Sequence, residues 1–198
     1  MLDTVRADGK GLGSISFEKL LPMPEYVRAS MKPGQNGAAY GAQSASPNWE
    51  KKAVYPLWYT WSCENWGSKW DAVNFCPLDS EEDSDTMIFD TAWSPVPKVV
   101  EALSRRFPDQ TVTYRWAENE NLGTNVGATV LVNGTVISKQ IPEDYTREAF
   151  EMSADILGLD LADYGLYLSQ DGAAYEYHEH PPKEKNETPS SRRRAPAR

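Results

Sequence analysis

The sequence has few of the residues from which metal sites and disulfide frameworks are built. It contains two cysteines, Cys63 and Cys76, and two histidines, His178 and His180. Two cysteines without further closely spaced ligands indicate reduced thiols rather than a metal centre, and we expect no cofactor. No apolar run is long enough to span a bilayer, and residues 1–11 contain no apolar signal segment, so we expect a cytoplasmic protein.

What the chain does contain is enough apolar material for one folded domain. Its 198 residues are 40% hydrophobic and include seven tryptophans and ten tyrosines. We expect a single α+β domain over residues 1–180, in which 1–14 and 30–50 are loop-like. Residues 181–198 are polar and basic, and are expected to form a disordered tail.

Charge is distributed unevenly along the chain. The net charge is −9, but residues 183–198 carry +4, which leaves −13 on residues 1–182. An acidic body favours basic partners and repels nucleic-acid backbones, so nucleic acid is expected to contact at most the basic tail, around Arg192–Arg194. The most acidic segment is predicted to be a solvated loop with the carboxylates Asp79, Glu81, Glu82, Asp83 and Asp85.

Apolar spacing and turn residues predict the regular elements. The clearest is a helix capped by Ser94, with Pro95 at its first position, apolar residues on one face and an end at Pro108. The other predicted elements are a helix over 56–66, strands over 69–75, 86–93 and 111–118, a hairpin of 128–132 and 135–139 about Asn133-Gly134, a helix over 143–157 capped by Gly158, and a hairpin of 166–169 and 173–178.

Three segments in order resemble the YubB-like family of phage and plasmid proteins. They are ISFEKLLPMP at 15–24, Asn65-Trp66-Gly67-Ser68-Lys69-Trp70-Asp71-Ala72, and the stretch from TAWSPVP to FPD at 91–109. The resemblance extends over roughly half of the chain. It implies a ferredoxin-like antiparallel sheet with helices on one face, here followed by a helix, a hairpin and the tail. The family is largely uncharacterised, so the resemblance implies no reaction.

The chain departs from the family at its start. Family members have a strand and a helix before the Pro-Met-Pro segment, whereas only fourteen residues precede it here, and these have neither pattern. Either the start is truncated or another element fills the edge of the sheet. An unfilled edge is a site for pairing with another chain, so a homodimer through that edge is one hypothesis.

The tryptophans are concentrated in one part of the sequence. Trp49, Trp58, Trp61, Trp66 and Trp70 lie within 22 residues. They could form an aromatic binding platform or a core between helix and sheet. The helical spacing of Trp58 and Trp61 favours the core, and Trp49 is expected to be the most exposed.

Polar residues near this cluster are the candidate site residues. Asn65 and Lys69 flank Trp66, in a motif that also includes Trp70, and could bind an anion, although capping and surface roles are more common for such residues. Asp71 and Asp90 could hold Mg²⁺ from adjacent strands, but a structural role is favoured. His178 and His180 would share a strand face and bind divalent ions only adventitiously.

These features favour a non-enzymatic, protein-binding accessory protein of a phage or other mobile element. Its acidic loop could occupy the basic nucleic-acid channel of a host defence nuclease, as an anti-CRISPR-like inhibitor would. One alternative is single-strand nucleic-acid binding on a platform of Trp93, Tyr114 and Trp116, which the acidic charge opposes. Another is a metal-assisted hydrolase that uses Asp71, Asp90 or His178.

Overall fold

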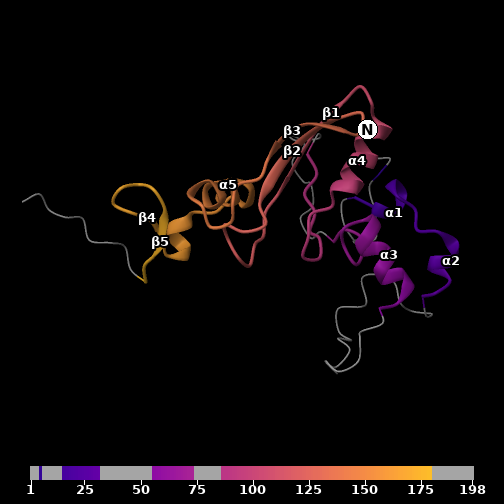
Figure 1. The fold of residues 1–198 in the computed structure, drawn as a ribbon, viewed down its shortest axis with the longest axis horizontal. Coiled ribbons are helices and arrows are strands. Elements are labelled where there is room, and N and C mark those ends of the chain that lie inside the picture. Colours follow the sequence, from indigo (N-terminus) through magenta and orange to yellow (C-terminus); the bar gives the residue numbers. More distant parts are fainter. Residues whose placement is uncertain (1–4, 6–14, 32–54, 74–85, 180–198) are drawn as a thin grey trace, which may run out of the picture.

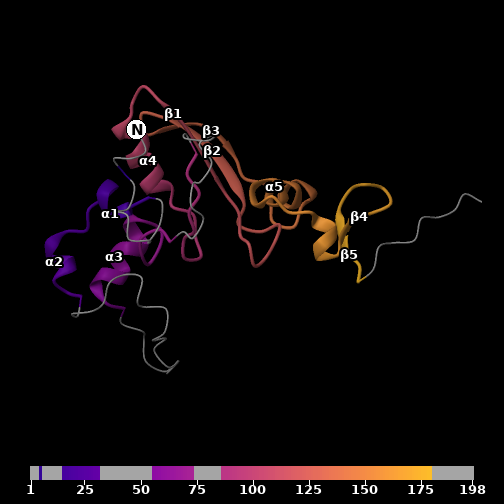
Figure 2. The same ribbon diagram turned by 180° about the vertical axis from the view of Figure 1, so that it is seen from behind.

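The computed structural model of the protein describes residue 5 and residues 15–31, 55–73 and 86–179. In this part of the chain the molecule is elongated (Figure 1). Helices α1 (Phe17–Leu20), α2 (Glu25–Arg28), α3 (Leu57–Asn65) and α4 (Pro97–Arg106) gather at one end. The sheet runs from them towards α5 (Arg147–Leu157), as the reverse view also shows (Figure 2).

The main sheet is antiparallel and has the order β1-β2-β3. Its strands are β1 (Thr111–Trp116), β2 (Gly127–Val132) and β3 (Thr135–Gln140). The turn between β2 and β3 is the predicted Asn133-Gly134, whose φ angles are 48° and 73°. Two positive φ angles match the right-handed twist of the flanking strands, so this turn fixes the hairpin and its register.

Beyond α5, the chain forms a 3₁₀ turn, η3 (Leu161–Tyr164), and a two-stranded sheet of β4 (Leu166–Leu168) and β5 (Tyr175–Tyr177). Helix α5 begins after Thr146, whose hydroxyl accepts a hydrogen bond from the Ala149 N–H, and ends at Gly158 in the left-handed conformation. The predicted Gly158 cap and the last hairpin are therefore confirmed, although the helix begins later than the pattern indicated.

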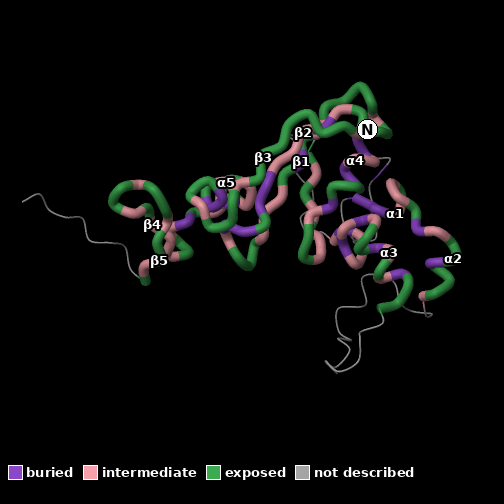
Figure 3. Tube along the Cα trace, viewed as in Figure 1, coloured by how far each residue is buried: buried purple, intermediate pink, exposed green. Residues whose placement is uncertain are grey.

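Buried residues from α1–α4 and the β1–β3 sheet form the principal hydrophobic cluster. Figure 3 marks the buried positions along the chain in purple. Val99, Val100 and Leu103 of α4 are buried, as predicted from their spacing, in the same cluster as Tyr114 and Leu131 of the sheet. A separate group of buried side chains lies around α5, and comprises Val126, Ala149, Phe150 and Leu161.

Two expectations about the region before α4 are wrong. The predicted strands over 69–75 and 86–93 are reduced, in the described residues, to one antiparallel bridge between Val73 and Asp90. Helix α4 begins at Pro97 after Val96, not after Ser94. The Val96 N–H donates to the Tyr114 hydroxyl at 3.0 Å, so a side chain from the sheet serves the start of the helix.

Removing the Tyr114 hydroxyl is expected to destabilise the protein. Tyr114→Phe leaves the buried Val96 N–H unpaired, which costs about 1–3 kcal/mol of unfolding free energy. Burial also raises the pKa of Tyr114 to about 12, so the phenol stays protonated over the ordinary pH range.

Urea denaturation measures this effect, and Tyr177→Phe is the matched control because Tyr177 is 73% exposed. Equal unfolding free energies for the two variants would contradict the role given to Tyr114.

Candidate functional site

The motif around Trp66 follows the end of α3 and contacts the N-terminal helices. The Trp66 indole N–H donates to the Leu21 carbonyl at 2.9 Å, just after α1. Its ring makes edge contacts with Phe17 and Trp61, with centroid distances of 6.1 and 5.4 Å. Trp66 is buried, so the most distinctive residue of the motif holds α1 and α3 together.

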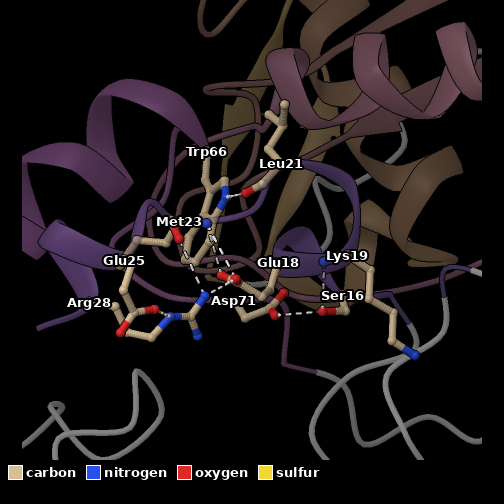
Figure 4. Close-up of polar contacts among 9 residues, drawn as sticks. All are labelled: Ser16, Glu18, Lys19, Leu21, Met23, Glu25, Arg28, Trp66 and Asp71. Atoms are coloured by element: carbon tan, nitrogen blue, oxygen red, sulfur yellow. Dashed lines mark hydrogen bonds and ion pairs between the residues drawn. The ribbon is translucent and has the colours of Figure 1, made fainter.

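Asp71 makes the second connection to α1 (Figure 4). Its carboxylate accepts hydrogen bonds from the Phe17 N–H at 2.6 Å, the Ser16 hydroxyl at 3.0 Å and the Ala72 N–H at 2.8 Å. Burial raises the pKa of Asp71, while these hydrogen bonds lower it, and burial is the larger effect. The carboxylate thus fixes the start of α1 at the cost of desolvating a charge.

The next turn of the N-terminal segment has its own ion pairs (Figure 4). The Glu18 carboxylate accepts from the Met23 N–H at 3.2 Å and pairs with Arg28 of α2. Arg28 also lies 3.7 Å from the Glu25 carboxylate. These contacts join α1 to α2. The hydrogen bonds of Asp71 and the ion pairs of Glu18 and Arg28 therefore together hold residues 16–28 in place.

The centre of the motif contacts the segment that leads into α4. Gly67 has a φ of +85°, and a Cβ there would lie 2.8 Å from the Pro95 carbonyl oxygen, so both the backbone conformation and the close approach favour glycine. The buried Ser68 hydroxyl accepts from the Ala92 N–H at 3.3 Å. The motif is therefore a junction between the N-terminal helices and residues 92–96.

Lys69 is the motif residue that lies between two indole rings. Its Nζ lies 3.4 Å from the centroid of the Trp93 ring and 3.9 Å from that of Trp70, so two indoles flank the ammonium. Burial lowers the pKa of Lys69. Trp93 is 70% exposed and has a positive φ of 69°. The Trp70 indole N–H is buried and has no hydrogen-bond partner among the described residues.

Other predicted site residues lie apart or have structural roles. The Asn65 amide donates to the Trp61 carbonyl at 2.9 Å, a structural contact inside α3. Trp58 is buried beside Trp66, as the core interpretation predicted. The acidic loop over 79–85, the basic tail, Trp49, Cys76 and His180 lie outside the described residues.

The predicted metal ligands are not assembled. Asp71 is directed to Ser16 and Phe17, whereas Asp90 is joined to Val73 through its backbone. His178 lies 3.4 Å from the Glu176 carboxylate. Among the described residues there is no group of three or more His, Cys, Asp or Glu side chains that could hold a metal ion.

The platform of Trp93, Tyr114 and Trp116 is not presented as one surface. Tyr114 is buried and stacks on Trp116 with a centroid distance of 5.1 Å. Its hydroxyl is also engaged by the Val96 N–H. Trp93 alone of the three is exposed, so stacking of successive bases on all three rings is incompatible with this arrangement.

Sequence reasoning missed an exposed apolar surface on the sheet. All six residues of β3 are exposed, and within the described residues β3 pairs with β2 alone. Three large apolar side chains in and just after β3, which we call the β3 strip, are 44–62% exposed: Val136, Ile137 and Ile141. The sequence signal for this surface was the presence of apolar residues at 136, 137 and 141, shortly after a tight hairpin turn.

Carboxylates are frequent in the sequence around the β3 strip. Residues 117–160 contain eight carboxylates and two basic residues, Lys139 and Arg147. Arg147 is paired with Glu151 at 2.7 Å within α5. Gln140 at the end of β3 donates to Glu148 at 2.7 Å, which places the first turn of α5 beside the strand end. One carboxylate of α5 therefore lies at the Gln140 end of the strand.

Two substitutions of Asp71 are expected to separate the contribution of its hydrogen bonds to stability from the contribution of its charge. Asp71→Ala leaves the Phe17 N–H and the Ser16 hydroxyl without this acceptor and lowers the unfolding free energy by about 2–4 kcal/mol. Asp71→Asn retains an acceptor oxygen and costs less. Urea denaturation gives both values, with the exposed Asp90→Ala as control. An Asp71→Ala protein as stable as Asp90→Ala would refute the role of the carboxylate.

The same carboxylate predicts a pH dependence with a definite sign. Its pKa is raised in the folded protein, so folding favours its protonated form. The stability of the wild type relative to Asp71→Asn is therefore greatest below the ordinary aspartate pKa and declines as the pH rises through the raised value. Unfolding free energies from pH 7 down to pH 3.5 test this. A difference that grows as the pH rises would contradict it.

Comparison with known proteins supports the fold. Residues 65–160 match a family described as a ferredoxin-like domain in Api92-like protein. No curated protein and no solved structure matches the chain. No helix in the described parts of the chain is long and apolar enough to cross a membrane. The matched segment begins at Asn65, the first residue of the Trp66 motif, and includes α4, the β1–β3 sheet and α5. The predicted α+β, ferredoxin-like fold is therefore confirmed.

Proposed function

We propose that this chain is a non-enzymatic, protein-binding accessory protein of a phage or other mobile element, related to YubB-like proteins. The observation that supports this best is the β3 strip, which presents large apolar side chains at an edge of the sheet that has no further strand within the described residues. Exposed apolar side chains grouped at a sheet edge are typical of protein interaction sites. The proposed partner is a host or phage protein in the host cytoplasm.

Charge complementarity restricts the class of protein that the partner belongs to. The chain has a net charge of −9 and an isoelectric point near 4.8, so its field attracts basic surfaces. Basic surfaces line the channels of enzymes that handle nucleic acid, and an acidic protein can occupy such a channel and exclude the substrate. A host defence nuclease is therefore the partner class we propose, with an anti-CRISPR-like inhibitory outcome.

The acidic loop remains a second predicted contact for this partner. Its carboxylates, between residues 79 and 85, lie outside the described residues, so their part in binding rests on sequence alone. Reversing their charge tests the loop separately from the β3 strip. Unchanged affinity for the partner after the reversal would remove the loop from the interface.

Single-strand nucleic-acid binding is retained as a second candidate because of Trp93. This indole is 70% exposed and stacks over the Lys69 ammonium, a pairing that can receive a base and a phosphate. Binding there would weaken with salt and on Trp93→Ala. Salt-independent or absent binding to a short single strand would eliminate this candidate.

A pull-down distinguishes the two candidates. We expect the tagged protein to recover one protein at close to stoichiometric amount from host lysate, with or without nuclease treatment. The measurement is mass spectrometry of the bound fraction, followed by an assay of the partner's own activity.

Loss of every protein after nuclease treatment would instead favour nucleic-acid binding. Recovery of a second copy of this chain alone, as an edge-paired homodimer, would contradict a heterologous partner.

A further inference from the structure

The outer edge of β3 is available for strand pairing. In the described residues β3 is the last strand of the sheet, and its six side chains are all exposed. An edge strand offers a row of unpaired backbone N–H and C=O groups that another extended segment can use. This geometry specifies an extended backbone as the ligand, rather than a helix or a small molecule.

The opposite edge of the sheet is a poorer candidate. The exposed residues of β1 are Thr111, Thr113 and Arg115, which are polar, and Arg115 is already paired with Asp155 of α5. On β3 and just beyond it, Ile137 and Ile141 are exposed apolar residues. A segment added at β3 would bury apolar area as well as pair its backbone, so β3 is favoured on both counts.

Two features of β3 restrict what can pair with it. Val136 and Ser138 pair with successive residues of β2, so Ile137 between them has no partner in β2 and forms a bulge. Bulges and lysines on edge strands oppose indiscriminate pairing, and Lys139 supplies the second feature. The pairing site is therefore short and selective.

Charge determines the composition of the added segment. Past the end of β3, the exposed Glu143 and Asp144 precede α5, and Glu148 lies at the Gln140 end of the strand. A segment with apolar residues opposite Ile137 and basic residues towards Glu143 satisfies both parts of this surface. A second copy of this chain has a net charge of −9 and is disfavoured by repulsion.

We infer that the β3 edge binds an extended, basic and apolar segment of the partner protein as an added fourth strand. This rests on the proposed function in that the partner is a protein, and it names the surface and the form of the bound segment. Backbone pairing supplies the general affinity, while Ile137 and Glu143 select apolar and basic side chains.

A synthetic peptide tests the inference without an identified partner. The probe is a fluorescently labelled, capped octapeptide, Thr-Val-Thr-Val-Thr-Lys-Val-Lys, and its controls replace both lysines with glutamate or the central valine with proline. We expect saturable binding of the probe to the full chain by fluorescence anisotropy, and at least tenfold weaker binding of each control peptide. Hydrogen exchange should slow in residues 135–140 when the probe binds.

Variants of the chain locate the site. Ile137→Pro removes an N–H at a bulge, where proline is tolerated, and is expected to weaken probe binding at least tenfold. Ile137→Thr keeps the N–H and should weaken it less. Glu143→Lys should weaken binding severalfold at low salt, whereas Asp163→Lys, which reverses the same charge on exposed η3, should leave it unchanged.

The outcomes separate this inference from the proposed function. Equal binding of all three peptides, protection outside residues 135–140, or full binding by Ile137→Pro would overturn the β3 assignment. Probe-induced sedimentation as a dimer would show self-pairing instead and would also overturn it. If Ile137→Pro still recovers the lysate partner, the proposed function stands and the β3 inference fails. If the probe binds β3 but lysate yields no protein, the function fails and the edge site stands.

Discussion

The contact between the Asp71 carboxylate and the start of α1 is the constraint on which the N-terminal half of the described structure depends. It joins residues separated by 54 positions, and the neighbouring Trp66 indole makes a parallel connection to Leu21. Helix α1 has only four residues and could not persist alone, because so short a helix does not repay its nucleation cost. The motif residues therefore stabilise α1 through tertiary contacts.

This constraint explains why a distinctive string of residues need not be a binding site. Trp66, Ser68 and Asp71 direct their polar atoms to Leu21, Ala92 and the start of α1. Gly67 permits the close approach to Pro95. Lys69 is partly exposed between two indoles, while the most exposed apolar residues of the β1–β3 sheet lie in β3. The motif residues thus have structural roles, and the proposed binding surface lies in a different part of the matched domain.

The sequence predicted elements whose signals are local. The spacing of Val99, Val100 and Leu103 indicates the buried face of α4, and Asn133-Gly134 specifies the hairpin turn, because each depends only on nearby residues. The start of α4 could not be predicted, since the acceptor for the Val96 N–H is the distant Tyr114 hydroxyl. Residues 69–73 alternate like a strand, but Asp71 is committed to α1. The apolar residues at 136, 137 and 141 were a signal for the exposed surface at β3. That β3 is the edge strand of the described sheet could not be predicted, because a hairpin signal does not say which strand lacks a second neighbour.

The central claim is that the motif is internal and that partners bind at β3. Photocrosslinking in the host cell tests it most directly, with benzoylphenylalanine placed at either Ile137 or Trp93, two exposed positions on different surfaces. The account predicts a discrete protein adduct from position 137 and none from position 93. Adducts formed only from position 93, or adducts that contain nucleic acid, would contradict it.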